Sequence, residues 1–181
     1  RYIYLGDTAR SPYGTRPPET VLEYTKQAVD FLFSQGAEIV ILACNTASAE
    51  ALRVIQQEYL PQKYPKHKRV LGVIVPTLEV ISILSRGRVG VLATEGTVQS
   101  HTFSKELQKI NPKIKIYEQA APLLVPLVEA GEHTSKPGLQ ILQNYLHPLL
   151  QKNIDTLILG CTHYGHLETQ VRTLVGPKVR V

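Results

Sequence analysis

Short apolar runs alternate along the chain with longer stretches in which apolar residues recur every three or four positions. The runs are typical of parallel strands covered by helices, and the periodic stretches are typical of amphipathic helices. The expected strands are residues 2–5, 37–43, 69–75, 88–93, 113–118 and 156–160. The expected helices are residues 19–35, 46–59, 98–110, 122–131 and 137–151, a short one after Pro76 and a last one ending near residue 174.

This regular alternation of strand and helix favours the α/β class, with doubly wound layers around parallel sheets. In such sheets ligands bind beyond the carboxyl ends of the strands. Two segments repeat one pattern there: IVILACNT at 39–46 and TLILGCTH at 156–163 each contain an apolar strand, a small residue, a cysteine and a nearby threonine. Each half of the chain therefore presents a thiol at the same kind of position.

Composition narrows the class of protein. The 181 residues are 43% hydrophobic and 19% charged, which is ordinary for a globular protein. No apolar run approaches the roughly 18 residues of a membrane span, and no signal-peptide pattern opens the chain. We therefore expect a cytoplasmic protein with no membrane association, in which the two cysteines are free thiols.

The net charge of +5 changes this picture little. The cationic residues are dispersed, and the densest run, KYPKHKR at 63–69, has neither the continuous basic face nor the stacking aromatics of a nucleic-acid site. We expect a solvated loop there and no nucleic-acid partner. The chain has no methionine and begins at Arg1, which predicts a processed, trimmed or fragmentary chain.

The two cysteines are the main candidates for chemistry. Cys44 and Cys161 each follow a predicted strand and precede a helix, whose N-terminal backbone N–H groups can bind a carboxylate and lower the pKa of a thiol. His163 is close enough in sequence to activate Cys161 or to bind an anion. Hydroxyl and amide groups of Asn45, Thr46 and Thr162 lie beside the thiols.

Three other interpretations compete with acid–base chemistry. A strand cysteine is often a buried, inert small hydrophobe. Cys161, His163 and His166, with Cys44, offer soft metal ligands, although C-x-H-x-x-H is not a usual zinc pattern. A Cys–His hydrolase is the third alternative, but it needs one thiol rather than two.

Six sequence blocks resemble one known family in order along essentially the whole chain. They are GDTARSPYGTRPPET (6–20), ACNTASA (43–49), GVIVP (72–76), GVLATEGTVQS (90–100), PLLVPLVEAG (122–131) and LILGCTHYG (157–165). The chain resembles the cofactor-independent aspartate/glutamate racemases, and within them the glutamate racemases. The resemblance implies two α/β domains that face each other across a cleft, with one thiol from each. We expect the boundaries 1–76 and 77–176, with 177–181 starting a return to the first domain.

The resemblance also implies a reaction. One cysteine removes the α-proton of glutamate as a thiolate, and the other returns a proton to the opposite face as a thiol. No cofactor and no metal are needed, and the family supplies D-glutamate for peptidoglycan. A homodimer is expected. An aspartate or related racemase, or a non-catalytic amino-acid-binding or regulatory relative, remains an alternative.

Individual roles follow from the same resemblance. Cys44 serves the D-enantiomer and Cys161 the L-enantiomer, while His163 and Glu129 tune the second thiol. The alternative for Glu129 is that it is only a solvated carboxylate at the end of a helix. Asp7 is expected to cap a loop. The expected substrate-binding residues are Tyr13 and Gly14 for the side-chain carboxylate, Asn45, Thr46 and Thr162 for the α-carboxylate and amine, Thr94 and Thr97 on the pocket wall, and His163.

The chain departs from the family pattern in two ways. The family opens with a β–α segment that carries an Asp-Ser pair and ends with a segment that returns to the first domain, and we expect both to lie outside this chain. We therefore expect the 181-residue chain alone to have little racemase activity. Gly165 stands where the family usually has proline, which loosens the loop that carries His163.

Overall fold

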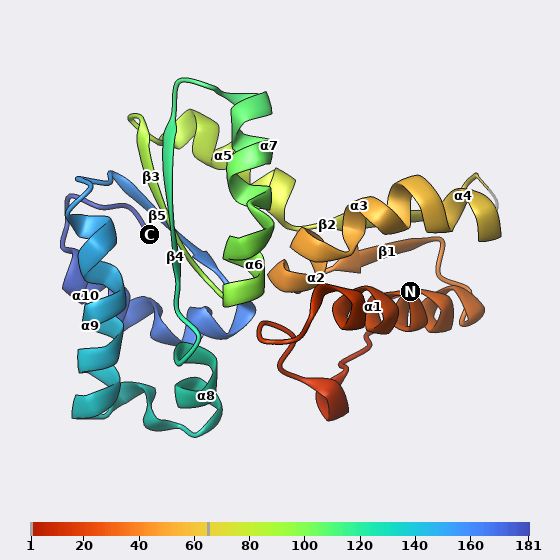
Figure 1. Ribbon diagram of the computed structural model, residues 1–181, viewed down its shortest axis with the longest axis horizontal. Coiled ribbons are helices and arrows are strands. Elements are labelled where there is room, and N and C mark those ends of the chain that lie inside the picture. The colour runs from red at the N-terminus through yellow and green to blue at the C-terminus, as the bar shows by residue number, and fades with distance from the viewer. Residues whose placement is uncertain (1, 65) are drawn as a thin grey trace.

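Two parallel sheets organise the protein. A computed structural model describes residues 2–64 and 66–181 and divides them into two lobes (Figure 1). The first lobe surrounds β1 (Ile39–Leu42) and β2 (Arg69–Gly72), which pair in parallel. The second lobe surrounds β3 (Arg88–Ala93), β4 (Lys115–Ala120) and β5 (Thr156–Gly160) in the order β4-β3-β5, again all parallel. The α/β class with parallel sheets is therefore confirmed.

Helices and short turns connect these strands. In the first lobe they are η1 (Thr8–Arg10), α1 (Pro18–Ser34), α2 (Asn45–Glu50), α3 (Leu52–Val54), the π-helical η2 (Ile55–Tyr59) and α4 (Leu60–Lys63). In the second lobe they are α5 (Ile74–Leu84), α6 (Glu95–Ser100), α7 (Thr102–Ile110), α8 (Leu124–Glu129), η3 (Glu132–Thr134), α9 (Lys136–Leu150), η4 (Thr162–Leu167) and α10 (Glu168–Val175). Within the described ranges, no helix has the length and apolar character needed to cross a bilayer.

The second lobe is doubly wound around β3, the central strand. Val91 faces a cluster that includes Leu78 of α5 and Phe103 of α7. Leu92, one residue on, faces the opposite cluster with Leu142 of α9 and its neighbours from α8, η4 and α10. This alternation follows from the two-residue period of a strand, so both faces of the sheet are covered.

The first lobe is covered on one face. Val40 and Leu42 point into a cluster with Val21, Val29 and other residues of α1 and α2. The intervening side chains point away from it and are exposed: Ile39 by 59%, Ile41 by 64% and Leu71 on β2 by 47%. The β1–β2 sheet thus has a bare aliphatic face.

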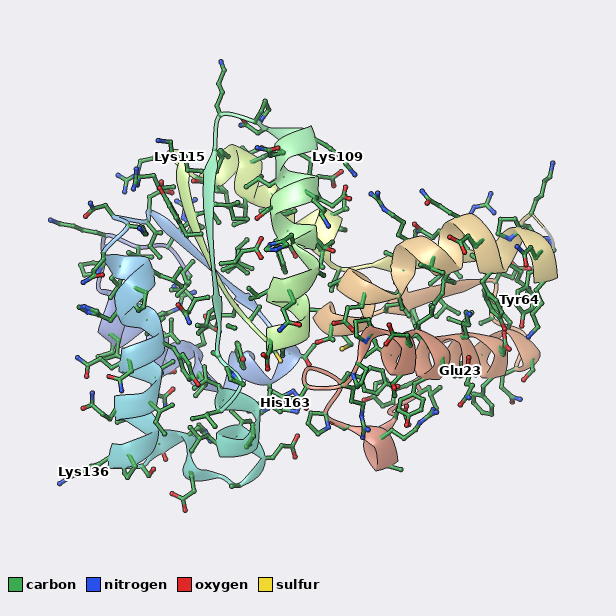
Figure 2. All side chains as sticks on the ribbon, viewed as in Figure 1. Glu23, Tyr64, Lys109, Lys115, Lys136 and His163 are labelled. Atoms are coloured by element: carbon green, nitrogen blue, oxygen red, sulfur yellow. The ribbon has the colours of Figure 1, made fainter. Side chains whose placement is uncertain are left out.

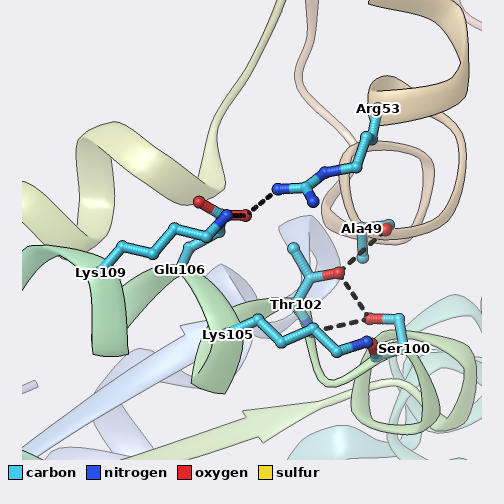
Figure 3. Close-up of polar contacts among 7 residues, drawn as sticks. All are labelled: Ala49, Arg53, Ser100, Thr102, Lys105, Glu106 and Lys109. Atoms are coloured by element: carbon cyan, nitrogen blue, oxygen red, sulfur yellow. Dashed lines mark hydrogen bonds and ion pairs between the residues drawn. The ribbon is translucent and has the colours of Figure 1, made fainter. Parts of the chain in front are cut away.

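The lobes meet where α2 and its continuation lie against α6 and α7 (Figures 1 and 3). The Thr102 hydroxyl donates to the carbonyl of Ala49 at 3.0 Å. Arg53 forms an ion pair with Glu106 at 2.7 Å, and Lys109 pairs with the same carboxylate at 2.7 Å. Exposed ion pairs of this kind contribute little, so the close packing of α2 on α6 sets how the lobes fit together.

One expected strand is wrong. Residues 2–5 form no strand, although their apolar pattern predicts one, and the side chains of Tyr2 and Tyr4 are almost fully exposed. A strand needs a neighbouring backbone to pair with, and β1 and β2 pair only with each other among the described residues.

Other boundaries move for local reasons. The strand predicted over 69–75 ends at Gly72, because α5 begins at Ile74 and has Pro76 in its first turn, where no backbone N–H is needed. The helix predicted over 46–59 continues to Lys63 through the π-helical turn. The helix predicted over 98–110 begins earlier and is divided by His101, which has a positive φ of 54°.

Candidate active site

The two free cysteines occupy equivalent positions in the two lobes. Cys44 follows β1 and caps the start of α2, and Cys161 follows β5 and precedes η4. Cys44 is half-buried, and Cys161 is 9% exposed. Burial is the first cause that raises the pKa of Cys161, and a negative charge on Cys44 adds to it, so the two thiols lie within electrostatic reach of each other.

Burial dominates the acidity of both thiols. It raises the pKa of Cys44 above its ordinary value, although the backbone N–H groups of Ala47 and Thr46 act in the opposite direction. Burial raises the pKa of Cys161 to about 11, again against the N–H groups of the following turn. The N–H groups that follow each cysteine lower the thiol pKa, as expected, but desolvation outweighs them, so the net pKa of both thiols is raised.

His163 lies between Cys161 and a carboxylate. Its Nδ1 is 3.7 Å from the Cys161 sulfur, and its Nε2 is 2.6 Å from Glu129 Oε1. Because a carboxylate only accepts, Nε2 carries the hydrogen and Nδ1 is left facing the thiol. Figure 2 shows His163 beside α8, on the side of the second lobe that faces the first. This arrangement can move a proton between sulfur and imidazole.

A hollow of about 560 Å³ opens beside this group. It is lined by Val128, Glu129, His133, Thr162, His163 and His166. Thr162 is exposed in its wall, whereas Cys161 lies behind it. His133 is a residue that the sequence analysis did not single out, and the buried Nδ1 of its ring has no hydrogen-bond partner.

Tyr164 anchors the turn that carries His163. Its side chain is fully buried, and its hydroxyl donates to the carbonyl of Ala121 at 2.9 Å. Ala121 lies just before α8, the helix that ends at Glu129. The contact therefore ties together the two segments that bring His163 and Glu129 into hydrogen-bonding distance.

Three buried threonine hydroxyls join the lobes. Thr46 Oγ1 on α2 is 3.0 Å from Thr94 Oγ1, which is 2.9 Å from Thr97 Oγ1, and Thr97 is 3.4 Å from Thr46. All three are at most 5% exposed. Thr94 also accepts from the backbone N–H of Thr97 and so caps α6. The structure brings these three predicted residues together as a closed triangle of hydroxyls.

The loop before α1 reaches the same contact. The carbonyl of Gly14 accepts from the N–H of Gly96 at 3.1 Å, and a side chain at Gly14 would collide with Thr94. Tyr13 donates to Asp7, and burial is the first reason that its pKa is raised. Burial alone would raise the pKa of Asp7, but hydrogen bonds from Arg10 and Tyr13 lower it, so Asp7 holds the loop as an ionised anchor.

Two residues beside Cys44 complete the first-lobe side. Asn45, a predicted site residue, begins α2 and is half-buried. Glu50 ends α2, and its carboxyl lies against Gly96 on α6. The sequence analysis missed Glu50, because a glutamate near the end of an amphipathic helix is usually solvated and nothing local marks it as part of a contact between lobes.

No group of three or more histidine, cysteine, aspartate or glutamate side chains within residues 2–64 and 66–181 is arranged to hold a metal ion.

The whole chain is similar to several glutamate racemases. A glutamate racemase from Desulforudis audaxviator is 41% identical over 180 residues, which are 99% of this chain and 63% of that protein. A crystal structure of a glutamate racemase isoform from Bacillus anthracis superposes with a TM-score of 0.87 at 35% identity, over 97% of this chain and 64% of that one. The structure of the Francisella tularensis glutamate racemase in complex with D-glutamate gives 0.86 at 32% identity, with the same coverage.

The chain thus spans slightly less than two thirds of the length of these relatives. Residues 1–181 match the family described as Asp/Glu/hydantoin racemase. Since that match runs from the first residue of the chain to the last, the protein belongs to the Asp/Glu/hydantoin racemase family.

Proposed function

We propose that this protein interconverts L-glutamate and D-glutamate by proton transfer between two thiols and the α-carbon, with no cofactor. The observation that carries the proposal is the pair of free thiols: Cys44 follows β1 and Cys161 follows β5, and after burial a charge on Cys44 also raises the pKa of Cys161. The relatives named above are glutamate racemases, and one was solved with D-glutamate. A racemase needs two proton-transfer groups on opposite faces of one carbon.

The raised pKa of the second thiol shapes the mechanism. With a pKa of about 11, Cys161 is a thiolate in only roughly one molecule in ten thousand at pH 7. As a neutral thiol it is well suited to donate a proton to the α-carbon. To act as a base it must first lose its proton, and His163 Nδ1 at 3.7 Å is the group that can take it. Glu129 stabilises the imidazolium that results.

Cys44 performs the same step on the opposite face. The N–H groups of Thr46 and Ala47 favour its thiolate against the cost of burial. In our proposal Cys44 acts on the D-enantiomer and Cys161 on the L-enantiomer. The α-proton of an amino acid is very weakly acidic, so hydrogen bonds to the α-carboxylate and fixed positions must supply much of the barrier reduction.

The remaining polar groups bind the substrate. Three threonine hydroxyls, those of Thr46, Thr94 and Thr97, are hydrogen-bonded to one another in this structure. When the lobes separate to admit the substrate, these hydroxyls donate to its α-carboxylate instead. The other proposed substrate-binding residues are Asn45, Thr162 and His163, and Tyr13 with Gly14 for the side-chain carboxylate.

Further features of the whole protein belong to the same proposal. We propose domain boundaries near 76, in the first turn of α5, and at 176; residues 177–181 run along β5 through Arg180 before the proposed return to the first domain. The protein works in the cytoplasm as a homodimer and supplies D-glutamate for peptidoglycan. Sedimentation equilibrium tests the dimer, because a monomer at micromolar concentration would contradict it.

Solvent deuterium exchange at the α-carbon tests the reaction. The protein is incubated with L-glutamate in D₂O, and both enantiomers are followed by mass spectrometry. We expect deuterated D-glutamate to form. Cys44→Ser and Cys161→Ser each abolish turnover, although one-sided exchange can persist in either. A protein that binds glutamate but exchanges no α-proton would be a binding protein and would refute the racemase proposal.

A further inference from the structure

Glu50 occupies an unusual place for a glutamate. It is the last residue of α2, and its carboxyl lies in the contact between α2 and α6. Gly96 makes the room, since a side chain there would collide with Glu50 Oε1 and would lie 3.5 Å from the carbonyl of Gly14. The other oxygen, Oε2, is buried and has no hydrogen-bond partner. The side chain is partly buried as a whole, but its Oε2 atom is enclosed at the contact between the lobes.

An enclosed carboxyl without a partner prefers to be neutral, because a buried charge with no compensating contact is costly. Burial, followed by the negative charge of Glu19 on α1, raises the pKa of Glu50 to about 7. Near neutral pH the side chain is consequently divided between a neutral form that fits the contact and an ionised form that does not.

The charge on Glu50 reaches the first thiol. Cys44 caps the start of the helix that Glu50 ends, and an ionised Glu50 raises the pKa of Cys44. The other titratable groups coupled to this pair are Glu19 on α1, Tyr13 on the loop before α1 and Cys161 after β5. Glu50 is thus a charged group that acts on Cys44 from within the contact between the lobes.

We propose that Glu50 is a positioning residue for Cys44: its neutral carboxyl completes the contact between the lobes over Gly96, and its ionisation opposes formation of the Cys44 thiolate. The catalytic meaning of this step rests on the proposed racemase function, but the coupling itself does not. The Glu50 carboxyl then affects two properties of the site: the close packing of α2 on α6, and the ionisation of the Cys44 thiol.

The protonation of Cys44 can be followed directly in the 181-residue chain labelled with [3-¹³C]cysteine. The chemical shift of the cysteine Cβ changes when the thiol ionises, and the Cys161→Ser variant assigns the two signals. Titrations are recorded for the wild type and for Glu50→Gln, which keeps the shape of the side chain and removes its charge. Glu58→Gln is the matched control, because Glu58 is an exposed acid in the same helical run.

In the wild type we expect the Cys44 signal to titrate in two steps, a small one near pH 7 from Glu50 and a large one at higher pH from the thiol. Glu50→Gln removes the small step and moves the large one to lower pH, whereas Glu58→Gln changes neither. A purely structural role for Glu50 would alter the melting temperature and leave the Cys44 titration unchanged. An unchanged Cys44 midpoint in Glu50→Gln, or an equal shift in Glu58→Gln, would overturn the proposal. Since no turnover is measured, loss of the racemase proposal would not affect this result.

Discussion

The hydroxyl of Tyr164 offers a direct test of how the second lobe holds its proton-transfer group. Tyr164→Phe removes one oxygen from a fully buried side chain and takes away one of the two donors to the carbonyl of Ala121, which keeps the N–H of Leu124 at 3.1 Å. Because the acceptor stays partnered, the loss is that of one net hydrogen bond, about 0.5–1.5 kcal/mol of unfolding free energy. For a chain of this size that corresponds to a fall in Tm of about 1–6 °C.

The assay is equilibrium unfolding in urea, followed by far-ultraviolet circular dichroism, with Tm measured separately by calorimetry. Tyr2→Phe is the matched control, since Tyr2 is fully exposed and its hydroxyl contacts only solvent. We expect the control to match the wild type and Tyr164→Phe to unfold at lower urea with an unchanged slope. A loss below about 0.5 kcal/mol would mean that the Tyr164 hydroxyl adds nothing to the bond that Leu124 already makes, and the reasoning about this anchor would be refuted.

Three further predictions concern charge and proton transfer. Asp155 accepts from the N–H groups of Arg86 and Arg88 at 3.0 and 2.8 Å; Asp155→Ala should lower the unfolding free energy by about 2–4 kcal/mol at pH 7. Burial alone would raise the pKa of Asp155, but the hydroxyls of Thr156 and Ser85, together with these N–H groups, lower it below 3.8. In urea titrations the difference must therefore shrink as the pH falls below that value, and a constant difference would contradict it. Burial raises the pKa of Cys161 from 9.0 to about 11, so above pH 9 the unfolded chain loses the thiol proton before the folded chain does. The unfolding free energy should therefore fall between pH 9 and pH 11, and it should fall less steeply in Cys161→Ser. Equal slopes of unfolding free energy against pH in the two proteins would exclude this cause. Glu129→Ala leaves His163 unsupported and should slow deuterium exchange about tenfold or more; unchanged exchange would remove Glu129 from the mechanism.

The elements that could be predicted from the sequence are those whose pattern and surroundings agree. The strand at 156–160 is an apolar run and is buried on both faces, so its bounds are those of β5. The helix predicted over 19–35 corresponds to α1, because Pro17 and Pro18 suit its first turn and Gly36 follows its end with a positive φ of 87°. In such segments local chemistry and tertiary packing favour the same structure.

Predictions of element bounds failed where pairing with a strand far away in the sequence determines those bounds. The strand expected over 113–118 lies at Lys115–Ala120, because its register is set by pairing with β3, in which Arg88 is opposite Lys115. Ile114, apolar and therefore assigned to the strand, is instead a buried residue just before it. No pattern within six residues of sequence contains that information.

The same distinction between local and distant information applies to the residues of the candidate site. Cys44 and Cys161 could be found because strand, small residue and thiol are adjacent in the sequence. The partnership of His163 with Glu129 spans 34 positions, and only the family resemblance indicated it. Glu50 was missed because its environment is created by Gly96 and Gly14, which come from elsewhere in the chain. The net acidity of the thiols could not be predicted either, since it depends on burial.

The bare aliphatic face of the β1–β2 sheet has a practical consequence for handling the protein. Ile39, Ile41 and Leu71 stand side by side on two paired strands with about half or more of each side chain in water. A flat apolar patch between open strand edges favours reversible clustering as concentration rises. The solubility ceiling of the purified chain should therefore be set by this patch, and should rise on cooling as the hydrophobic attraction weakens.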